Sequence, residues 1–231
     1  MMKIYKYNFH ILLLIGRLHR SSRIFLLVAC LLAMTCMSAQ TVNVDDILKK
    51  TSQIYEKWGG VHVKFSAHMR VEMSNTSESY EGTIRMKKDK FVLTAPDMTI
   101  WFDGTTQWTY MGSIEEVHVI TPSDDDLRFI NPMILLQNYK KDFNVSYVGE
   151  STTTRAKMAY DLVFTPQKKS NIEKVEIQIE KSSSLPAKLV VRMRNQVLSV
   201  TIDEMKADEP ADEIFTFSKS SFPNAEVIDL R

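Results

Sequence analysis

Between residues 61 and 73, apolar and polar side chains alternate without an error, and no other feature of this sequence restricts its fold as strongly. Side chains of a β-strand point alternately to opposite faces of a sheet, so a period of two predicts a strand with one dry and one wet face. The seven apolar positions are Val61, Val63, Phe65, Ala67, Met69, Val71 and Met73.

A less regular alternation recurs through the rest of the chain, and turn signals such as Asp103-Gly104 separate the segments. Short connections imply antiparallel neighbours, so we expect one antiparallel sheet of about ten to eleven strands. A twisted sheet of that size tends to curl. Besides 61–73, strands are expected around residues 84–86, 91–93, 101, 108–110, 117–119, 145–147, 160–164, 175–179 and 189–193.

Two segments have helical signals instead. Residues 45–58 begin with two aspartates, carry an apolar stripe at a spacing of three to four, and end at Gly59-Gly60. The second segment is broken: residues 123–126 start one piece, and Asn131-Pro132 starts an unusually apolar one. The sequence therefore predicts a predominantly antiparallel α+β fold, in which two helical segments cover the apolar face of a curved sheet.

The first 39 residues have a composition of their own, with five cations and no acid. Three arginines precede an uncharged run over residues 24–34, and the small residues Ser38 and Ala39 follow, which is the order of a secretory signal peptide. The run is shorter than the roughly 20 residues that span a bilayer. We expect cleavage after Ala39 and one domain over residues 40–231. Leu27 to Cys30 also resembles a lipoprotein signal box, which leaves lipidation of Cys30 as an alternative.

Composition excludes several classes of protein. With 44% hydrophobic residues, the chain is neither a disordered tail nor a fibrous repeat, and a net charge of +1 argues against a nucleic-acid binder. Removing 39 of the 231 residues leaves 192, with 24 cations, 28 acids and a net charge of −4. Both cysteines, Cys30 and Cys36, are removed as well, so a hydrophobic core alone must hold the domain together.

Residues that could carry catalysis or bind a metal are scarce. His62 and His68 lie six positions apart on the wet face of one strand, about 20 Å from each other, so they cannot bind one metal ion together. The acids at 124–126 suit a helix start better than a cation site. No nucleophile, phosphate-loop or zinc motif is present. We therefore expect neither an enzyme nor a metal or cofactor site.

The dry face of the sheet is rich in aromatic residues and methionine, which adapt to irregular apolar guests. These residues either pack under the helices as an ordinary core or line a partly open hollow for a hydrophobic ligand. Two short helices are a thin cover for about ten strands, which favours the hollow. The residues concerned include Phe65, Met69, Met86, Phe91, Trp101, Trp108, Tyr110, Phe164 and Met193.

Four stretches, in this order, resemble the LolA family of periplasmic outer-membrane lipoprotein carriers. They are residues 80–88 (Tyr-Glu-Gly-Thr-Ile-Arg-Met-Lys-Lys), 102–110 (Phe-Asp-Gly-Thr-Thr-Gln-Trp-Thr-Tyr), 131–136 (Asn-Pro-Met-Ile-Leu-Leu), and the ending from Phe-Thr-Phe at 215–217 to Val-Ile-Asp-Leu-Arg at 227–231. With the leading helix, they extend over nearly the whole exported domain.

The resemblance implies an incomplete, strongly curved β-barrel with a helical lid, and a cavity for the acyl chains of lipidated proteins. It also implies a periplasmic monomer that takes its cargo from an inner-membrane ABC-type release complex and passes it to an outer-membrane acceptor. On this basis the cavity is expected to be lined by Phe65, Met69, Ile84, Met86, Phe91, Trp101, Trp108, Tyr110, Phe164, Ile177 and Val191, with Ile130, Met133, Ile134 and Leu135 on the lid.

Lys88 departs from the family pattern. The carriers have an arginine at this position that latches the lid, whereas lysine lacks the planar fork needed for a bidentate contact. Lys88 is therefore the candidate latch, with an altered closure. The departure leaves two alternatives to a lipoprotein carrier: a paralogue that binds another lipid, and an envelope sensor of mislocalised lipoproteins.

Overall fold

The structure is a computed structural model that describes residues 42–123, 127 and 139–231. The predicted signal peptide and the predicted lid residues Ile130, Met133, Ile134 and Leu135 lie outside the described residues. The described elements are α2 (Val44–Trp58), β1 (Val61–Val71), β2 (Thr76–Lys87), β3 (Lys90–Ala95), β4 (Met98–Phe102), β5 (Gln107–Met111), β6 (Glu116–Ile120), β7 (Phe143–Thr152), β8 (Met158–Pro166), β9 (Ile172–Glu180), β10 (Pro186–Met193), β11 (Gln196–Ala207), the 3₁₀ turns η1 (Asp212–Phe215) and η2 (Lys219–Ser221), and β12 (Glu226–Asp229).

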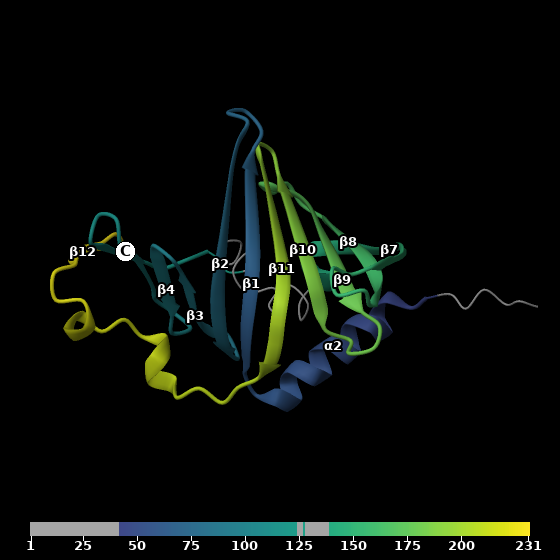
Figure 1. Cartoon of the computed structure of the whole chain (residues 1–231), viewed down its shortest axis with the longest axis horizontal. Helices are drawn as coiled ribbons and strands as arrows, with labels where there is room; N and C mark the ends of the chain where they lie inside the picture. Colours follow the sequence, from purple (N-terminus) through teal and green to yellow (C-terminus); the bar gives the residue numbers. More distant parts are fainter. Residues whose placement is uncertain (1–41, 124–126, 128–138) are drawn as a thin grey trace, which may run out of the picture. The chain divides into compact units, whose positions relative to one another are not determined.

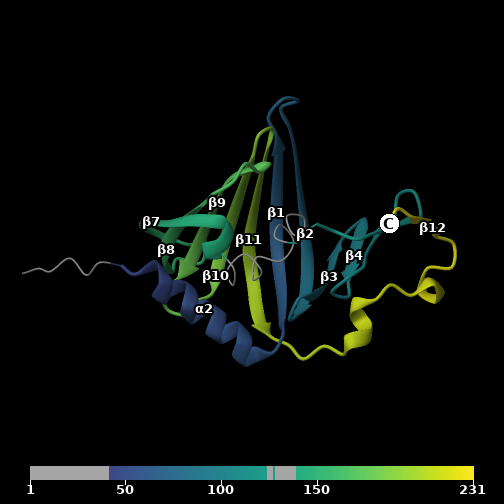
Figure 2. The same cartoon turned by 180° about the vertical axis from the view of Figure 1, so that it is seen from behind.

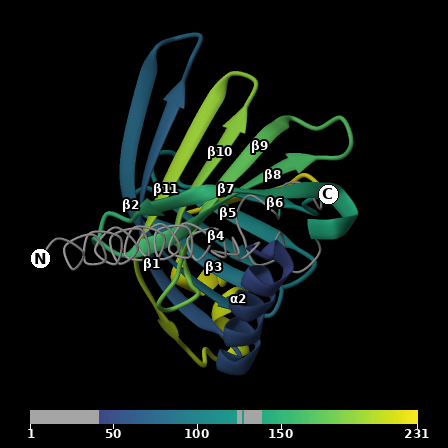
Figure 3. The same ribbon diagram turned by 90° about the vertical axis from the view of Figure 1, so that its right-hand side faces the viewer.

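All twelve described strands form one sheet that does not close on itself. Its order is β12-β6-β5-β4-β3-β2-β1-β11-β10-β9-β8-β7. Each neighbouring pair is antiparallel except β12 and β6, which run parallel. Figures 1, 2 and 3 show that the sheet is curved rather than flat. The predicted fold class, a mostly antiparallel, incomplete and strongly curved barrel accompanied by a helix, is confirmed.

Strand β1 carries the alternation seen in the sequence and pairs along its whole length with β2 and β11. Val61, Val63, Phe65 and Ala67 are buried, and the residues between them are more exposed. The strand ends at Val71, however, and Met73 is 83% exposed in the turn beyond it. The prediction that the strand continues to residue 73 is wrong, because the turn brings Thr76 back to pair with Val71.

Helix α2 forms where the sequence predicts a helix. The Asn43 side chain caps its start by accepting a hydrogen bond from the Asp45 amide (2.9 Å), and Gly59 ends it in the left-handed region at φ 72°. Thr51 donates a hydrogen bond to the Ser184 carbonyl (2.7 Å) in the β9–β10 turn, and Tyr55 donates one to the Lys88 carbonyl (3.5 Å) in the β2–β3 turn. The helix is thereby fixed across one end of the sheet, as Figure 1 shows for β9 and β10.

The inner face of the sheet is the one that carries Val63 and Phe65 of β1, and the outer face is the one that carries Ser66 and His68. Residues 208–229, called the C-terminal strap below, contact the outer face of β2–β4 before β12 joins β6. Three ion pairs fix the strap to the sheet: Arg85–Asp208 (2.7 Å), Lys87–Asp212 (2.6 Å) and Lys90–Asp212 (2.9 Å).

Candidate functional site

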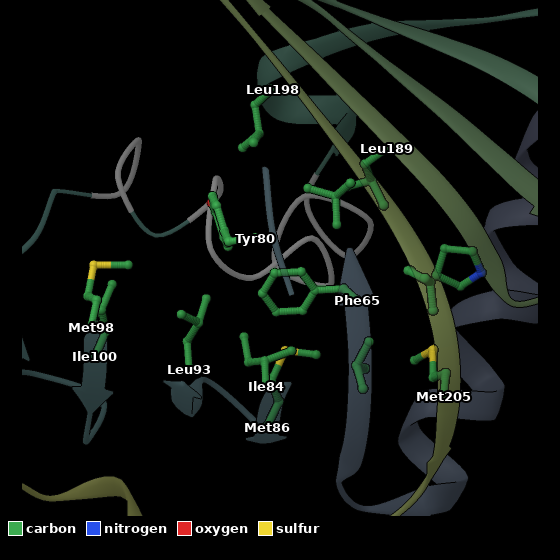
Figure 4. Close-up of a pocket in the computed structure, with 14 residues that line it drawn as sticks. Phe65, Tyr80, Ile84, Met86, Leu93, Met98, Ile100, Leu189, Leu198 and Met205 are labelled. Atoms are coloured by element: carbon green, nitrogen blue, oxygen red, sulfur yellow. The ribbon is translucent and has the colours of Figure 1, made fainter. Parts of the chain in front are cut away.

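A cavity of about 200 Å³ opens on the inner face of the sheet. Strands β1 to β4, β10 and β11 supply its walls. Figure 4 shows the Phe65 ring in the middle, with Met98 and Ile100 on one side and Leu189 and Met205 on the other. The lining residues are Val63, Phe65, Tyr80, Ile84, Met86, Leu93, Met98, Ile100, Pro186, Leu189, Leu198, Val200, Ile202 and Met205.

None of these fourteen side chains carries a charge at neutral pH. Tyr80 alone has a polar group, and burial, followed by the nearby Glu78 carboxylate, raises the pKa of its hydroxyl. Three of the residues are methionines, whose unbranched thioether chains adjust to irregular guests. The cavity can therefore shield an apolar group from water, and its one hydroxyl is that of Tyr80.

Gly82 makes room for the Phe65 ring. The two residues lie opposite each other in the β1–β2 ladder, and the ring meets Tyr80 edge-on at 6.4 Å between centroids. A Cβ atom on residue 82 would lie 2.6 Å from Cζ of Phe65 and 2.8 Å from the Thr94 carbonyl oxygen. The glycine of the Tyr-Glu-Gly-Thr-Ile stretch thus allows the aromatic ring to lie across the sheet in the cavity.

Eight of the predicted cavity residues lie on the inner face, and three of them, Phe65, Ile84 and Met86, line the cavity. The other five lie on the inner face as well, because each pairs in the ladder with a residue that lines the cavity or with a partner of such a residue. They lie beside the cavity and do not line it. Phe164, for example, packs edge-on against Phe143. These five are Met69, Phe91, Phe164, Ile177 and Val191.

Trp101, Trp108 and Tyr110 differ from their prediction, because they lie on the outer face. Trp101 packs edge-on against Phe217 (5.5 Å between centroids) and Phe222 (5.4 Å) of the C-terminal strap. Tyr110 contacts Phe222 as well, at 4.6 Å, and Trp108 packs onto the same cluster. For Trp101 the cause is β4, which has apolar residues at almost every position, so that its alternation does not show which of them face inward. Trp108 and Tyr110 do alternate with polar residues in β5, but the apolar face of β5 is the outer one, which packs against the C-terminal strap.

The other eleven lining residues are not among those predicted from the sequence. Three of them, Leu198, Val200 and Ile202, follow the same period of two as β1, so the signal was present in the sequence. They belong to β11, which pairs with both β1 and β10 and so joins the two halves of the sheet. The others are Val63, Tyr80, Leu93, Met98, Ile100, Pro186, Leu189 and Met205.

Lys88 lies exposed in the turn between β2 and β3, in the left-handed region at φ 56°. Its carbonyl accepts the hydrogen bond from Tyr55, whose pKa rises to about 12 because its hydroxyl is buried and faces the charge of Asp89. The predicted lid residues lie outside the described part of the chain, so the latch role of Lys88 stays a prediction.

The described residues contain neither a metal-binding cluster nor a membrane-spanning helix. No group of three or more histidine, cysteine, aspartate or glutamate side chains there is placed to hold a metal ion. Among the same residues, no helix has the length and apolar character needed to cross a membrane.

The fold and the cavity define a class of protein: an open, curved β-barrel with an apolar hollow on its inner face. The sequence model for the outer membrane lipoprotein carrier protein LolA matches residues 34–196 of the chain, which is more than two thirds of its length. This chain belongs to the LolA family. No protein of curated function matches the sequence significantly.

The solved structures that are similar to this chain are distant from it in sequence. A LolA superfamily protein from Nitrosomonas europaea is 15% identical, with a TM-score of 0.43, over 77% of this chain and 99% of that one. An uncharacterised conserved protein from Thermus thermophilus is 13% identical, with a TM-score of 0.49, over 80% and 97%. The lipoprotein LppX of Mycobacterium tuberculosis is 12% identical, with a TM-score of 0.42, over 73% and 98%. Likeness at this level carries no conclusion about function.

Proposed function

We propose that this protein carries the acyl chains of lipidated proteins through the periplasm in its inner-face cavity. On this proposal it receives them from an ABC-type release complex of the inner membrane and delivers them to an acceptor in the outer membrane. The observation that carries the proposal is a cavity lined by fourteen uncharged side chains in a member of the LolA family. The basic, apolar leader over residues 1–39 supports export to the periplasm.

The physical need for such a carrier follows from the cost of exposing hydrocarbon. Each methylene moved from an apolar environment into water costs about 0.8 kcal/mol, so an acyl chain crosses an aqueous gap only under apolar cover. The cavity lies on one face of an open sheet and covers its guest from that side. A guest held in this way can leave again when it meets a better acceptor.

The size of the cavity sets an expectation for the guest. About 200 Å³ is less than the roughly 300–1,000 Å³ of usual ligand pockets, so this conformation accommodates part of an acyl chain. Rotamer changes of Met86, Met98 and Met205 would enlarge the hollow for the rest. We expect affinity to rise about fourfold with each added methylene and then to reach a plateau at the chain length that fills the cavity.

A displacement titration with a fluorescent fatty-acyl probe tests the proposal. Leu198→Trp would fill part of the cavity, because Leu198 lines it from β11. Val197→Trp is the matched control, since Val197 is its neighbour on the outer face and is half-buried as well. We expect Leu198→Trp to weaken probe binding at least tenfold and Val197→Trp to leave it unchanged. No binding by the native protein, or equal losses in both variants, contradicts the proposal.

A further inference from the structure

The polarity of the inner face changes one strand beyond the cavity. Directly paired residues of neighbouring strands project from the same face, so the ladder gives one continuous row of side chains across the sheet. The row begins with apolar cavity residues on β1 to β4 and ends with polar residues on β5 and β6. It consists of Val63, Ile84, Leu93, Ile100, Thr109 and His118.

Four polar side chains lie at this end of the inner face and are called the polar wall below: Gln107, Thr109, Glu116 and His118. Gln107 donates a hydrogen bond from Nε2 to the Thr109 hydroxyl (3.2 Å), and Nε2 of His118 meets a Glu116 carboxylate oxygen at 2.8 Å. Thr109 is the ladder partner of Ile100, which lines the cavity. The polar wall therefore adjoins the cavity at the distance between two neighbouring strands, about 5 Å.

Gln107 is the unusual member of the polar wall. Its side chain is buried, with 7% of the residue exposed, and its Oε1 atom has no hydrogen-bond partner among the described residues. Its ladder neighbours on the same face are Phe102 and Ile120, which cannot donate a side-chain hydrogen bond. A buried acceptor without a partner destabilises a fold, and nearly all such groups in native proteins are paired. This carbonyl oxygen thus has no donor among the residues that the structure describes, and a donor on a bound ligand would pair with it.

The charge of the polar wall limits which donor fits. The oxygen of Gln107 accepts a hydrogen bond. The Glu116 carboxylate lies at the other end of the polar wall, where it pairs with Met111 in the ladder, and it repels an anion. A hydroxyl or an amide N–H meets both conditions, whereas a carboxylate or phosphate next to the acyl chain does not. Glycerol hydroxyls and amide-linked acyl groups share this chemistry.

We infer that the polar wall is a second subsite, which binds the uncharged, hydrogen-bond-donating end of a ligand whose acyl chain lies in the cavity. The inference rests on the proposed function, because it assigns the polar end of the same ligand. It also gives the site a selectivity that the apolar cavity lacks: it favours neutral donor-bearing lipids over anionic ones.

Three ligands with the same acyl chain test the inference in the purified protein: 1-monolauroylglycerol, methyl laurate and laurate. We expect monolauroylglycerol to bind about fivefold more tightly than methyl laurate, the effect of one hydrogen bond, and laurate to bind most weakly. Gln107→Leu should abolish the preference for monolauroylglycerol and leave the affinity for methyl laurate unchanged. Gln178→Leu is the control, because Gln178 is a half-buried glutamine bonded to Ser151 (2.6 Å) on the outer face.

Glu116→Gln, at a partly exposed position, provides a second test that does not depend on changing the buried amide. It should increase the affinity for laurate relative to methyl laurate. Equal binding of the three ligands by the native protein overturns the inference and leaves the carrier proposal intact, as does an equal loss for all ligands in Gln107→Leu. If no ligand binds at all, both proposals fail.

Discussion

Two neighbouring residues of β4 show how differently the two faces of this sheet use apolar side chains. Ile100 on the inner face is 7% exposed and Trp101 on the outer face is 9% exposed, so burial hardly distinguishes them. Yet Ile100 borders a hollow of about 200 Å³, whereas Trp101 is in contact with two phenylalanine rings of the C-terminal strap. An apolar surface is therefore part of the core where other side chains of the protein pack on it, and a binding surface where none do.

The cover of the outer face comes from the chain itself. Phe215 of the strap is completely buried, and Phe217 and Phe222 pack on the aromatic residues of β4 and β5. The ion pairs of Asp208 and Asp212 hold the strap in place where it begins. The filled outer face should thus contribute mainly to stability, and the inner hollow mainly to binding.

The largest effect is expected when the outer aromatic cluster loses its central ring. Trp101→Ala should lower the free energy of unfolding by about 3–5 kcal/mol, because a cavity replaces a ring that contacts Phe217 and Phe222. Acyl-probe affinity of the folded protein should stay unchanged. Ile100→Ala, facing the existing hollow, should cost about 2 kcal/mol and weaken probe binding. Denaturant titration gives the stability of both variants, and a probe titration gives their affinity. If both variants lose stability and affinity to the same extent, the two faces do not have different roles.

An intermediate effect is expected at Gly82, where structure and binding meet. Gly82→Ala would force a Cβ atom to 2.6 Å from the Phe65 ring and 2.8 Å from the Thr94 carbonyl, so it should cost about 1–3 kcal/mol of stability. It should also weaken acyl binding, since the displaced ring lines the cavity. The double variant Gly82→Ala with Phe65→Leu should recover part of the lost stability. If it recovers none, the ring is not the group that requires glycine here.

The inner and outer faces also differ in how well the sequence predicts which residues they carry. Strict alternation in β1 showed which of its residues share the apolar face, and Phe65 is one of them. Ile84 and Met86 follow a period of two in their own strand, β2. In β4 both faces are apolar, because one lines the cavity and the other packs against the strap, so Trp101 could be assigned to either. Gln107 could not be found from the sequence for another reason: it lies in the stretch that follows Asp103-Gly104, but its missing hydrogen bond depends on the side chains that surround it in the folded protein. A contact between residues distant in the chain, such as Trp101–Phe217, leaves no local pattern.

A smaller effect, dependent on pH, should come from the ion pairs of the strap. Lys87 and Lys90 lower the pKa of Asp212 from 3.8 to about 2. The charged form of Asp212 is therefore more stable in the folded state than in the unfolded state. This contribution to the stability of the fold is present above pH 3.8 and is lost as the pH falls toward about 2. Asp212→Asn should flatten the dependence of the unfolding midpoint on pH in that interval.

Asp229 provides the control for this measurement. Its pKa is also about 2, but its partner Arg231 is only two residues away, so the pair can form in the unfolded chain as well. Asp229→Asn should therefore change the pH dependence of stability less than Asp212→Asn does. Equal changes in both variants would show that the strap is not fixed to the sheet by its ion pairs.

The smallest effect on stability is expected at Lys88, which belongs to neither face. Its side chain is exposed in the β2–β3 turn, so Lys88→Leu should change the free energy of unfolding by no more than about 0.5 kcal/mol. If the lysine latches a lid over the cavity, the same variant should change the rate at which a bound acyl probe is released to acceptor vesicles. Lys57→Leu, at the exposed end of α2, is the control. A release rate equal to that of the native protein would assign the covering of the inner face to other residues, and Lys88 would then be an ordinary turn residue.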